Sequence, residues 1–320
     1  PLNRVIENIK LSKNMFDVII FDESSQSDLF SLCALMRAKR AVIVGDDNQI
    51  SPEVIGVDQK TMHGLINKYL KDIPQKQWFD LQTSLYDTAL RVFPSRLMLK
   101  EHFRCVPEII NFSNNLAYSG EMLTLRYPKV HERFYPVINT IKVQDGIRDS
   151  RKPVNIKEAE CLVEKVVSCC RDSKYSNMSM GVISLLGDAQ GKLIENMLKE
   201  KIGVREIIKD IMFLPMVISK NVKFAPLIKE NDIKRFNVAA SRARNQMWLF
   251  HSVDLKDLNQ ECVRYSLLNY CLNYDKNGSD SRNIEYIFQT EFQKDVYNLI
   301  KNRGYKVTPE IKIGKYKMDF

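Results

Sequence analysis

The sequence lacks the features that mark membrane and secreted proteins. No apolar run approaches the roughly 20 residues that a helix needs to cross a bilayer, and no basic-then-apolar segment opens the chain as a secretion signal would. The first residue is Pro1 and not a methionine, so we expect the natural N-terminus to lie further upstream. These absences argue against a membrane-bound class and predict a cytoplasmic protein without a membrane partner.

Clusters of metal-binding side chains are missing as well. The seven cysteines are scattered without a C-x-x-C pair, and the closest two are the neighbours Cys169 and Cys170. The four histidines lie far apart in the chain. We therefore do not expect a closed zinc site, and unpaired cysteines of this kind fit a reducing cytoplasm.

Positive charge is in excess. Lys and Arg number 48 against 39 Asp and Glu, which gives a net charge of +9 and a pI near 9.1. Such a surplus suits a polyanionic partner, because basic side chains that neutralise phosphates release condensed counterions. Many basic proteins bind no nucleic acid, so charge alone leaves the partner open. A chain of 320 residues is long enough for two domains.

The first readable unit has the pattern of a β-α-β crossover. The apolar run 18–21 ends in two acids, Asp22 and Glu23, and a second apolar run spans 41–44. Between them, apolar residues recur at helical spacing over 29–36. This pattern predicts buried parallel strands, and the right-handed crossover places their carboxyl ends side by side. The acids are therefore expected at the edge where open α/β sheets bind ligands.

A second α/β region follows. We predict strands at 181–186, 211–217 and 246–250 and helices at 189–201 and 231–244. Pro215 indicates that the middle strand lies at a sheet edge or has an irregular position, since proline cannot donate to a ladder. The stretch 119–157, with several prolines and glycines, predicts loops and short strands.

The end of the chain has a different composition. The polar stretch 275–282 predicts a linker, followed by a helix at about 284–303 and strands at 305–307 and 317–320. The predicted fold class is α/β with parallel sheets. Its expected parts are an incomplete first lobe at 1–98, a second lobe at 99–272, a linker at 273–283 and the beginning of a small α/β domain at 284–320.

Asp22 and Glu23 have the physical form of the acid pair in a nucleotide hydrolase. One carboxylate can hold the water shell of Mg²⁺, while its neighbour orients and deprotonates the attacking water. Adjacent acids at a strand end are also common by chance, so the pair alone does not identify the chemistry.

The residues around these acids resemble a known family. Phe21-Asp-Glu-Ser-Ser-Gln26 and Val44-Gly-Asp-Asp-Asn-Gln-Ile-Ser-Pro52 resemble motifs II and III of superfamily 1 DNA or RNA helicases, with Ile50 in place of a leucine. The similarity is to the group that contains the nonsense-mediated-decay helicases and their bacterial relatives.

This resemblance implies a fold, cofactors and roles for residues. It implies two RecA-like lobes, ATP and Mg²⁺ as cofactors, and DNA or RNA, most simply a single strand, as the partner. Asp22 would hold Mg²⁺ through water, Asp46 would serve the nucleotide and its metal, and Glu23 would act on the catalytic water. Gln49 would sense the γ-phosphate and couple it to nucleic acid.

Further matches follow in the family's order over about residues 15–255. They are Ser84-Leu-Tyr86, Leu99–Ile109 with Phe112, Asn114 and Tyr118, Asn155 with Glu158 and Ala159, Gly181–Ser184 with Gln190, and Asn237–Arg244, which resembles motif VI. By resemblance, Arg104 and Arg242 would clamp the transferring phosphate, since a guanidinium fork matches phosphate oxygens. Taken singly, each arginine is better explained by a surface salt bridge. The collinear series favours the clamp.

Two more arginines belong to the motif VI segment. Arg235 lies seven residues before Arg242 and shares its helical face. It would support the site or contact nucleic acid, and an exposed basic face explains it equally well. Arg244 is a lesser candidate.

Two motifs of the family are absent. No G-x-x-x-x-G-K-[ST] loop occurs in the sequence, so the amide cradle for phosphate, its lysine and one magnesium ligand are missing. The F-Q-G-x-E-x-D loop of motif V is also missing, because Ile207-Ile208-Lys209 runs directly into Asp210. Truncation is the simplest explanation for the first gap. We expect this fragment to bind nucleotide weakly or not at all and to be inactive alone.

The last residues resemble the opening of a very-short-patch-repair-like endonuclease of the PD-(D/E)XK class. The matching segments are Thr290–Val296, Arg303–Tyr305 and Ile313–Asp319. By resemblance, Glu291 and Asp319 begin a metal site that later residues complete, so no nuclease activity is expected from this chain. A nuclease domain in the parent protein would indicate DNA repair or defence. An ordinary helix–strand pair is the alternative.

The sequence therefore favours a fragment of an ATP-dependent helicase or translocase. The alternative is a non-hydrolysing nucleic-acid-binding or scaffold protein descended from such a motor. A small-molecule enzyme with a Rossmann-type sheet is poorly supported, because no Gly-rich fingerprint follows a strand. The residues assign no protein partner.

Overall fold

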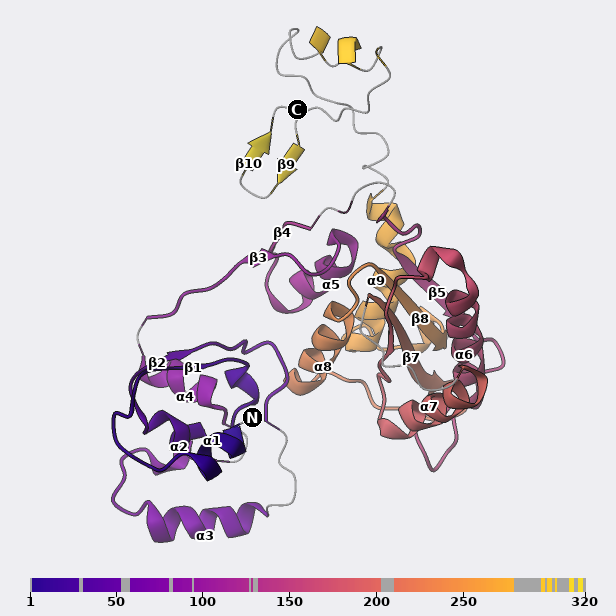
Figure 1. The fold of residues 1–320 in the computed structure, drawn as a ribbon. Coiled ribbons are helices and arrows are strands. Elements are labelled where there is room, and N and C mark those ends of the chain that lie inside the picture. Colours follow the sequence, from indigo (N-terminus) through magenta and orange to yellow (C-terminus); the bar gives the residue numbers. More distant parts are fainter. Residues whose placement is uncertain are drawn as a thin grey trace. The chain divides into compact units, whose positions relative to one another are not determined.

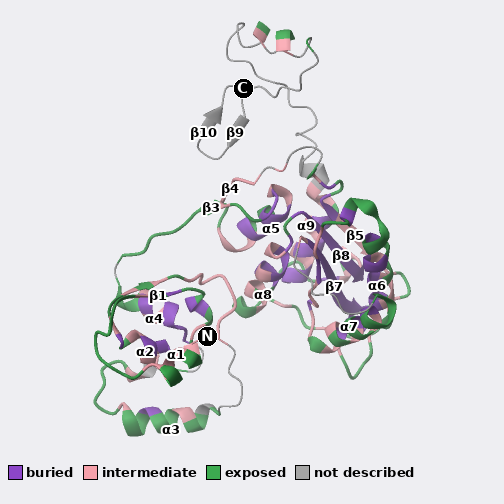
Figure 2. Cartoon of the chain, viewed as in Figure 1, coloured by how far each residue is buried: buried purple, intermediate pink, exposed green. Residues whose placement is uncertain are grey.

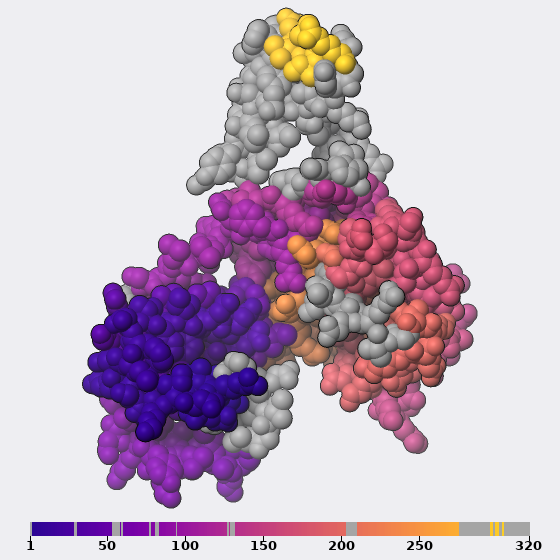
Figure 3. Space-filling model, in the orientation of Figure 1, coloured from indigo at the N-terminus to yellow at the C-terminus, as the bar shows by residue number. Residues whose placement is uncertain are grey.

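The structure is a computed structural model that describes most of the chain (Figure 1). The described residues are 2–28, 31–52, 58–80, 83–93, 95–126, 128, 132–202 and 210–278, with short pieces at 295–296, 298–300, 303, 311–313 and 316–318. The chain divides into two compact units, Pro1–Leu99 and Lys100–Phe320. In the surface view, the first unit runs from indigo to purple and the second from magenta through orange to yellow (Figure 3).

The first unit is built on two parallel strands. β1 (Phe16–Phe21) pairs with β2 (Ala38–Ile43) from Phe16↔Ala38 to Phe21↔Ile43, which confirms the predicted strand pair and its direction. Its helices are α1 (Leu2–Asn8), α2 (Ser31–Leu35), α3 (Gln59–Tyr69) and α4 (Leu85–Val92), with short 3₁₀ turns at Ser24–Gln26 and Lys76–Trp78. The core of this unit is small and centres on Phe21, Ala34 and Leu85.

The two strands of the first unit are only half buried, so the expectation of fully buried strands is wrong. Val18, Ile20 and Val42 are 44%, 69% and 49% exposed, whereas Phe21 is 8% exposed. Side chains alternate between the two faces of a strand. Phe21 and the partly buried Ile19 point to the core, and the described helices of this unit leave the other face open.

The second unit is a three-layer α/β/α structure. Its parallel sheet has the order β5-β8-β7-β6, formed by β5 (Ile138–Lys142), β6 (Met180–Val182), β7 (Ile211–Ser219) and β8 (Gln246–Ser252). Helices α6 (Ile156–Arg171) and α7 (Asp188–Ile202) cover one face, and α5 (Pro107–Ala117), α8 (Glu230–Ser241) and α9 (Val263–Gly278) cover the other (Figure 1). Together with the parallel pair of the first unit, this α/β architecture is consistent with RecA-like lobes.

Successive side chains of the central strands point to opposite faces of the sheet, so each strand contributes to two separate cores in the second unit. Ile211 and Phe213 join the core under α6 and α7. Met212 and Leu214, one position on, join the core under α5, α8 and α9. The sheet is therefore buried on both sides, as Figure 2 shows, and hydrophobic burial on both faces explains why β7 is apolar throughout.

β7 lies inside the sheet, between β8 and β6, so its predicted edge position is wrong. The predicted irregularity is confirmed, because the register with β8 shifts between Pro215 and Ser219. β6 pairs only with Ile211–Phe213, which leaves Pro215 beyond the end of that pairing. The missing N–H of proline therefore costs no ladder bond to β6.

Several element boundaries differ from those predicted. α8 ends at Ser241 and Arg242 is its C-cap residue, whereas the expected helix continued to 244. β6 spans only Met180–Val182. The long helix α6 was not predicted at all. α9 continues to Gly278, so residues 273–278 are helical where a linker was expected. Tyr274 packs against the core and helps to explain this extension.

The remaining elements are short. β3 (Glu101–His102) pairs in parallel with β4 (Leu123–Thr124), and 3₁₀ turns occur at Ser173–Tyr175 and Leu255–Asp257. Near the end of the chain, β9 (Ile311–Ile313) pairs antiparallel with β10 (Tyr316–Met318). Within the described ranges, none of the helices has both the length and the apolar character to span a membrane.

Candidate functional site

The acid pair follows β1 directly, at the carboxyl end of the strand pair. Asp22 and Glu23 are exposed, whereas Phe21 before them and Ser24 after them are buried. The Asp22 carboxylate accepts the N–H of Glu23 at 2.9 Å. Glu23 has a left-handed backbone, with φ 52° and ψ 38°, which is uncommon for residues other than glycine. Strained positions of this kind cluster at functional sites.

The loop after β2 is joined to this turn by backbone hydrogen bonds. Val44 N–H donates to the Phe21 carbonyl at 2.8 Å, and Ser24 N–H donates to the Val44 carbonyl at 2.9 Å. Gly45 lies against the ring of Tyr86, where an added Cβ would be 2.7 Å from two ring carbons. Only glycine fits there, so Gly45 lets this loop pass between the acid turn and α4.

Side-chain hydrogen bonds order the rest of the loop. The Asp46 carboxylate accepts the N–H of Asn48 at 2.9 Å and the amide Nε2 of Gln49 at 3.1 Å. Arg96 forms an ion pair with Asp47 at 3.1 Å. Burial of Tyr86 raises the pKa of its phenol. The loop is therefore held at both flanks, and the Gln49 amide is directed by Asp46.

The first unit thus brings Asp22, Glu23, Asp46 and Gln49 to one end of its strand pair. Exposed carboxylates of this kind are hard oxygen donors, which suit a hydrated Mg²⁺ held jointly with phosphate oxygens. Among the described residues, no three His, Cys, Asp or Glu side chains group as a complete metal site. The carboxylates of Asp22 and Glu23 are of the kind that could hold Mg²⁺ through water, together with phosphate oxygens.

The second unit brings the two predicted arginine segments together. Arg104 lies between β3 and α5, and Arg242 ends α8. Cys105 Sγ donates to the carbonyl of Ser241 at 3.1 Å, and Val106 N–H donates to the carbonyl of Arg244 at 3.0 Å. These bonds join chain segments that are more than 130 residues apart in sequence.

Arg104 is exposed and Arg242 is half-buried. Within the described part of the chain, neither side chain forms an ion pair. Arg244 does form an ion pair, with Asp210 at 3.4 Å, and this contact gives the residue a structural role. Arg235 is exposed on α8. Two guanidinium groups without a described carboxylate partner are therefore available at this end of the sheet.

Arg126 is a residue of this site that sequence reasoning missed. Its guanidinium donates to the carbonyls of Arg104 and Arg244, the latter at 2.8 Å, and to the Asn245 side chain. Burial and the nearby Arg244 lower the pKa of Arg126. Arg126 follows a two-residue strand in a segment without a motif, so only tertiary contacts reveal its position.

Asn155, Glu158 and Gln190, which belong to two of the motif-like segments, form a buried polar network. The Glu158 carboxylate accepts from Asn155 Nδ2 at 3.1 Å, Ser252 Oγ at 3.2 Å and Val217 N–H at 2.9 Å. Gln190 Oε1 accepts the N–H of Asn155 at 2.8 Å. Burial raises the pKa of Glu158 to about 7. These residues fix β7, β8 and α6 to one another.

The structure does not describe the predicted nuclease residues. Glu291 and Asp319 both lie outside the described ranges, as does the strand expected at 305–307. The strand expected from 317 corresponds in its described part to β10. The metal-site prediction for this segment stays a prediction.

A family model described as "AAA domain" matches residues 81–254. Arg104 and Arg242 lie inside this match, and Asp22, Glu23 and Gln49 lie before it. The "Uncharacterized ATP-dependent helicase MG140 homolog" of Mycoplasma pneumoniae is 23% identical over 362 residues, which cover 96% of this chain and 31% of that protein. The "Uncharacterized ATP-dependent helicase MJ0104" of Methanocaldococcus jannaschii is 22% identical, with 80% of this chain and 38% of that protein covered.

The chain therefore spans about a third of the length of these relatives. Among solved structures, an arterivirus nonstructural protein 10 (helicase) in complex with DNA covers 77% of this chain and 42% of its own, at 12% identity and a TM-score of 0.37. A similarity at that level does not establish a shared fold.

Proposed function

Because the chain belongs to the AAA domain family, we propose that it is part of an ATP-dependent nucleic-acid helicase or translocase of superfamily 1. The observation that carries this proposal is the joining of the Arg104 and Arg242 segments in the second unit. Two relatives that are named as ATP-dependent helicases support it. So does the order of the motif-like segments along the chain.

In this proposal, the first unit supplies the carboxylates. Asp22 would hold Mg²⁺ through water, and Asp46 orients Gln49, in keeping with its hydrogen bond to the amide. Glu23 takes a proton from the attacking water. Gln49 contacts the γ-phosphate and relays its presence to the nucleic acid. Mg²⁺ bound with ATP would neutralise part of the negative charge on the phosphates during transfer.

The second unit supplies positive charge. Arg104 and Arg242 would contact phosphate oxygens and stabilise the charge that spreads over them in the transition state. Arg126 would position both segments through their carbonyl groups. The partner is DNA or RNA in single-stranded form, which the net charge of +9 supports.

Measurement of ATP turnover by the natural gene product, with and without single-stranded DNA or RNA, tests the proposal. Glu23→Gln is expected to abolish strand-stimulated turnover, and Arg242→Ala to lower it about 100-fold or more. Arg171→Ala, an exposed arginine at the end of α6, is the matched control and should retain turnover. Undiminished turnover in both site variants would contradict the assigned roles.

A second candidate function is a non-hydrolysing nucleic-acid-binding or scaffold protein. A verified gene product without a phosphate-loop sequence would favour it. The same experiment separates the two: strand binding without any turnover by the verified gene product would favour the scaffold.

A further inference from the structure

A polar pocket lies at the carboxyl edge of the sheet in the second unit, away from the arginines. It has a volume of about 410 Å³ and is lined by Lys142, Gln144, Gly146, Lys220, Asn221 and Ser252. These residues end β5, β7 and β8 or follow them directly. The volume is within the range of roughly 300–1,000 Å³ for sites of small ligands, and the carboxyl edge is where open α/β sheets bind ligands.

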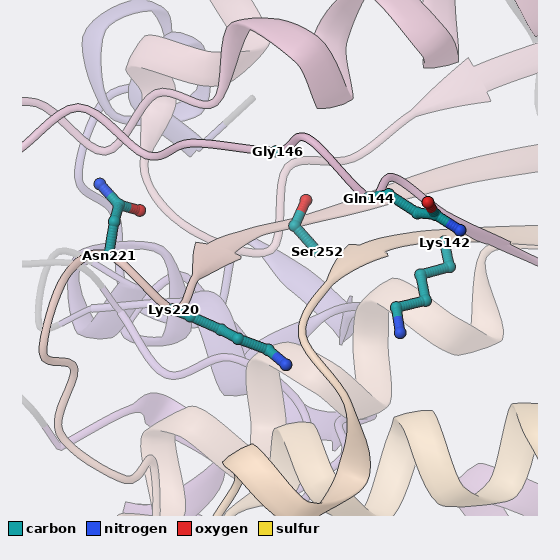
Figure 4. A pocket seen from close by; sticks show the side chains of 6 residues that line it. All are labelled: Lys142, Gln144, Gly146, Lys220, Asn221 and Ser252. Carbon is teal, nitrogen blue, oxygen red and sulfur yellow. The ribbon is translucent and has the colours of Figure 1, made fainter.

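Two lysines face one carboxylate beside this pocket. Lys142 Nζ is 2.5 Å from Oδ1 of Asp254, and Lys220 Nζ is 3.1 Å from Oδ2. Lys220 also lies 3.0 Å from Asp257. In Figure 4 the two ammonium groups extend toward the same space from different strands. Each oxygen of the Asp254 carboxylate is thus taken by a different ammonium group.

This arrangement also suits a phosphodiester. A phosphodiester also carries a single negative charge shared by two oxygens, and two ammonium groups can bind those oxygens from opposite sides. The side chains of Lys142, Lys220 and Asp254 are 45%, 53% and 31% exposed. Ion pairs this exposed contribute only about 0–1 kcal/mol, so a competing anion can replace the carboxylate.

The floor of the pocket is rigid. Ser252 Oγ donates to Glu158 and accepts from Asn155 Nδ2 at 3.0 Å. Asn221 Nδ2 donates to the Arg148 carbonyl at 2.8 Å. Gly146 lies so close to Ser252 that an added Cβ would be 2.0 Å from its Oγ. A ligand would therefore meet side chains that hydrogen bonds already hold in place, and only the exposed ends of the two lysines would need to move.

The pocket and the arginines occupy opposite ends of β8. Arg242 and Arg244 precede Gln246, where β8 begins, and Ser252 ends the strand. Seven strand residues span about 20 Å, so the two positive sites cannot contact the same phosphate. The loops at the carboxyl edge carry further basic side chains, along which a bound nucleic-acid strand could continue: Arg148, Arg151, Lys152 and Lys223.

We propose that this pocket binds one phosphodiester group of a single nucleic-acid strand through Lys142 and Lys220, and that Asp254 takes the place of the phosphate when no strand is bound. The inference rests on the proposed function, since it assigns a contact for the nucleic-acid partner. Loss of a lysine weakens strand binding, and loss of the Asp254 charge strengthens it. These opposite signs distinguish a competing carboxylate from a structural ion pair.

Fluorescence anisotropy of a labelled 20-nucleotide oligothymidylate, titrated with the full chain at several salt concentrations, tests the proposal. Lys142→Met and Lys220→Met should each weaken binding about fivefold, and the double variant should reduce the slope of log K against log salt by about 0.7, the value for one phosphate contact on a single strand. Asp254→Asn should tighten binding about threefold.

Helix α7 offers matched controls, because Lys199 and Glu195 form an exposed ion pair at 2.5 Å. Lys199→Met and Glu195→Gln change the net charge in the same way and should alter binding less than twofold. If the wild type binds the oligonucleotide and the lysine variants keep the same affinity and slope, the pocket assignment is overturned and the proposed function still stands.

If the wild type binds no oligonucleotide, thermal unfolding with inorganic phosphate tests whether the pocket binds a small anion instead. A rise in Tm that Lys220→Met removes identifies a small-anion site, and no rise excludes an anion site; both outcomes overturn the nucleic-acid assignment.

Discussion

Glu158 shows how one buried carboxyl group can make stability depend on pH. Its carboxylate is fully buried and accepts hydrogen bonds from a backbone N–H and two side chains. Burial nevertheless prevails and raises its pKa from 4.5 to about 7. The folded protein therefore binds this proton more tightly than the unfolded chain does.

The expected consequence is a loss of stability as pH rises. The contribution of Glu158 is fully present below its unfolded pKa of 4.5 and is lost as pH passes 7, by up to about 3 kcal/mol. Glu158→Gln removes this titration, and its amide can still accept from Val217. Urea unfolding at pH 5 and pH 7.5 measures the difference.

Two histidines act in the opposite direction over the same pH range. Burial lowers the pKa of His102 and His251 below 6.5, so their contribution to stability increases as pH rises to that value. The wild type and the Glu158→Gln variant both contain these histidines. The difference between their free energies of unfolding therefore reports the titration of Glu158 alone. Identical pH profiles for the two proteins would show that Glu158 does not titrate as expected.

At the scale of elements, Gly146 decides how closely the loop after β5 approaches the end of β8. An added Cβ would lie 2.0 Å from Oγ and 2.6 Å from Cβ of Ser252. Ser252 cannot retreat, because it ends a central strand and binds Glu158. Gly146→Ala should therefore lower the free energy of unfolding by about 1–3 kcal/mol, the usual cost of overpacking, as measured in urea.

Gly191 provides the control for that substitution. It lies in α7, and nothing would meet an added Cβ within 4 Å. Gly191→Ala should increase the free energy of unfolding by about 0.5–1 kcal/mol, because alanine restricts the unfolded chain and favours the helix. Equal effects of the two substitutions would mean that the loop after β5 moves freely and does not press on Ser252.

The elements also show what sequence patterns can predict. Apolar runs identified β1, β7 and β8, because a strand buried on one or both faces needs such residues. Helix α6 was not predicted, although its buried residues Leu162, Val163, Val166 and Val167 recur at helical spacing after the N-cap residue Asn155. Sequence patterns placed Pro215 at a possible edge, since pairing partners are not visible in a local pattern.

At the scale of the whole molecule, the two units have cores of very different size. The first unit buries few large apolar side chains and leaves one face of its strand pair exposed. The second unit buries both faces of a four-stranded sheet. Since hydrophobic burial dominates stability, the first unit should unfold at a lower urea concentration than the second.

The two tryptophans report on the units separately. Trp78 belongs to the first unit and Trp248 to the second. In urea titrations, fluorescence of a Trp248→Phe variant should change at a lower midpoint than fluorescence of a Trp78→Phe variant. Circular dichroism of the unmodified chain should then show two steps. Coincident midpoints from both variants would indicate one cooperative unit and contradict the expectation.

The sequence by itself determined the strand pair with acids at its carboxyl end, the α/β class, and the order of the motif-like segments. It could do so because these features depend on local periodicity and on residue type. Tertiary structure alone decided which distant segments meet. Cys105 reaches Ser241, Arg126 joins the carbonyls of Arg104 and Arg244, and Lys142 and Lys220 share Asp254. Such contacts arise from how strands and helices stack, and no local pattern of residues encodes them.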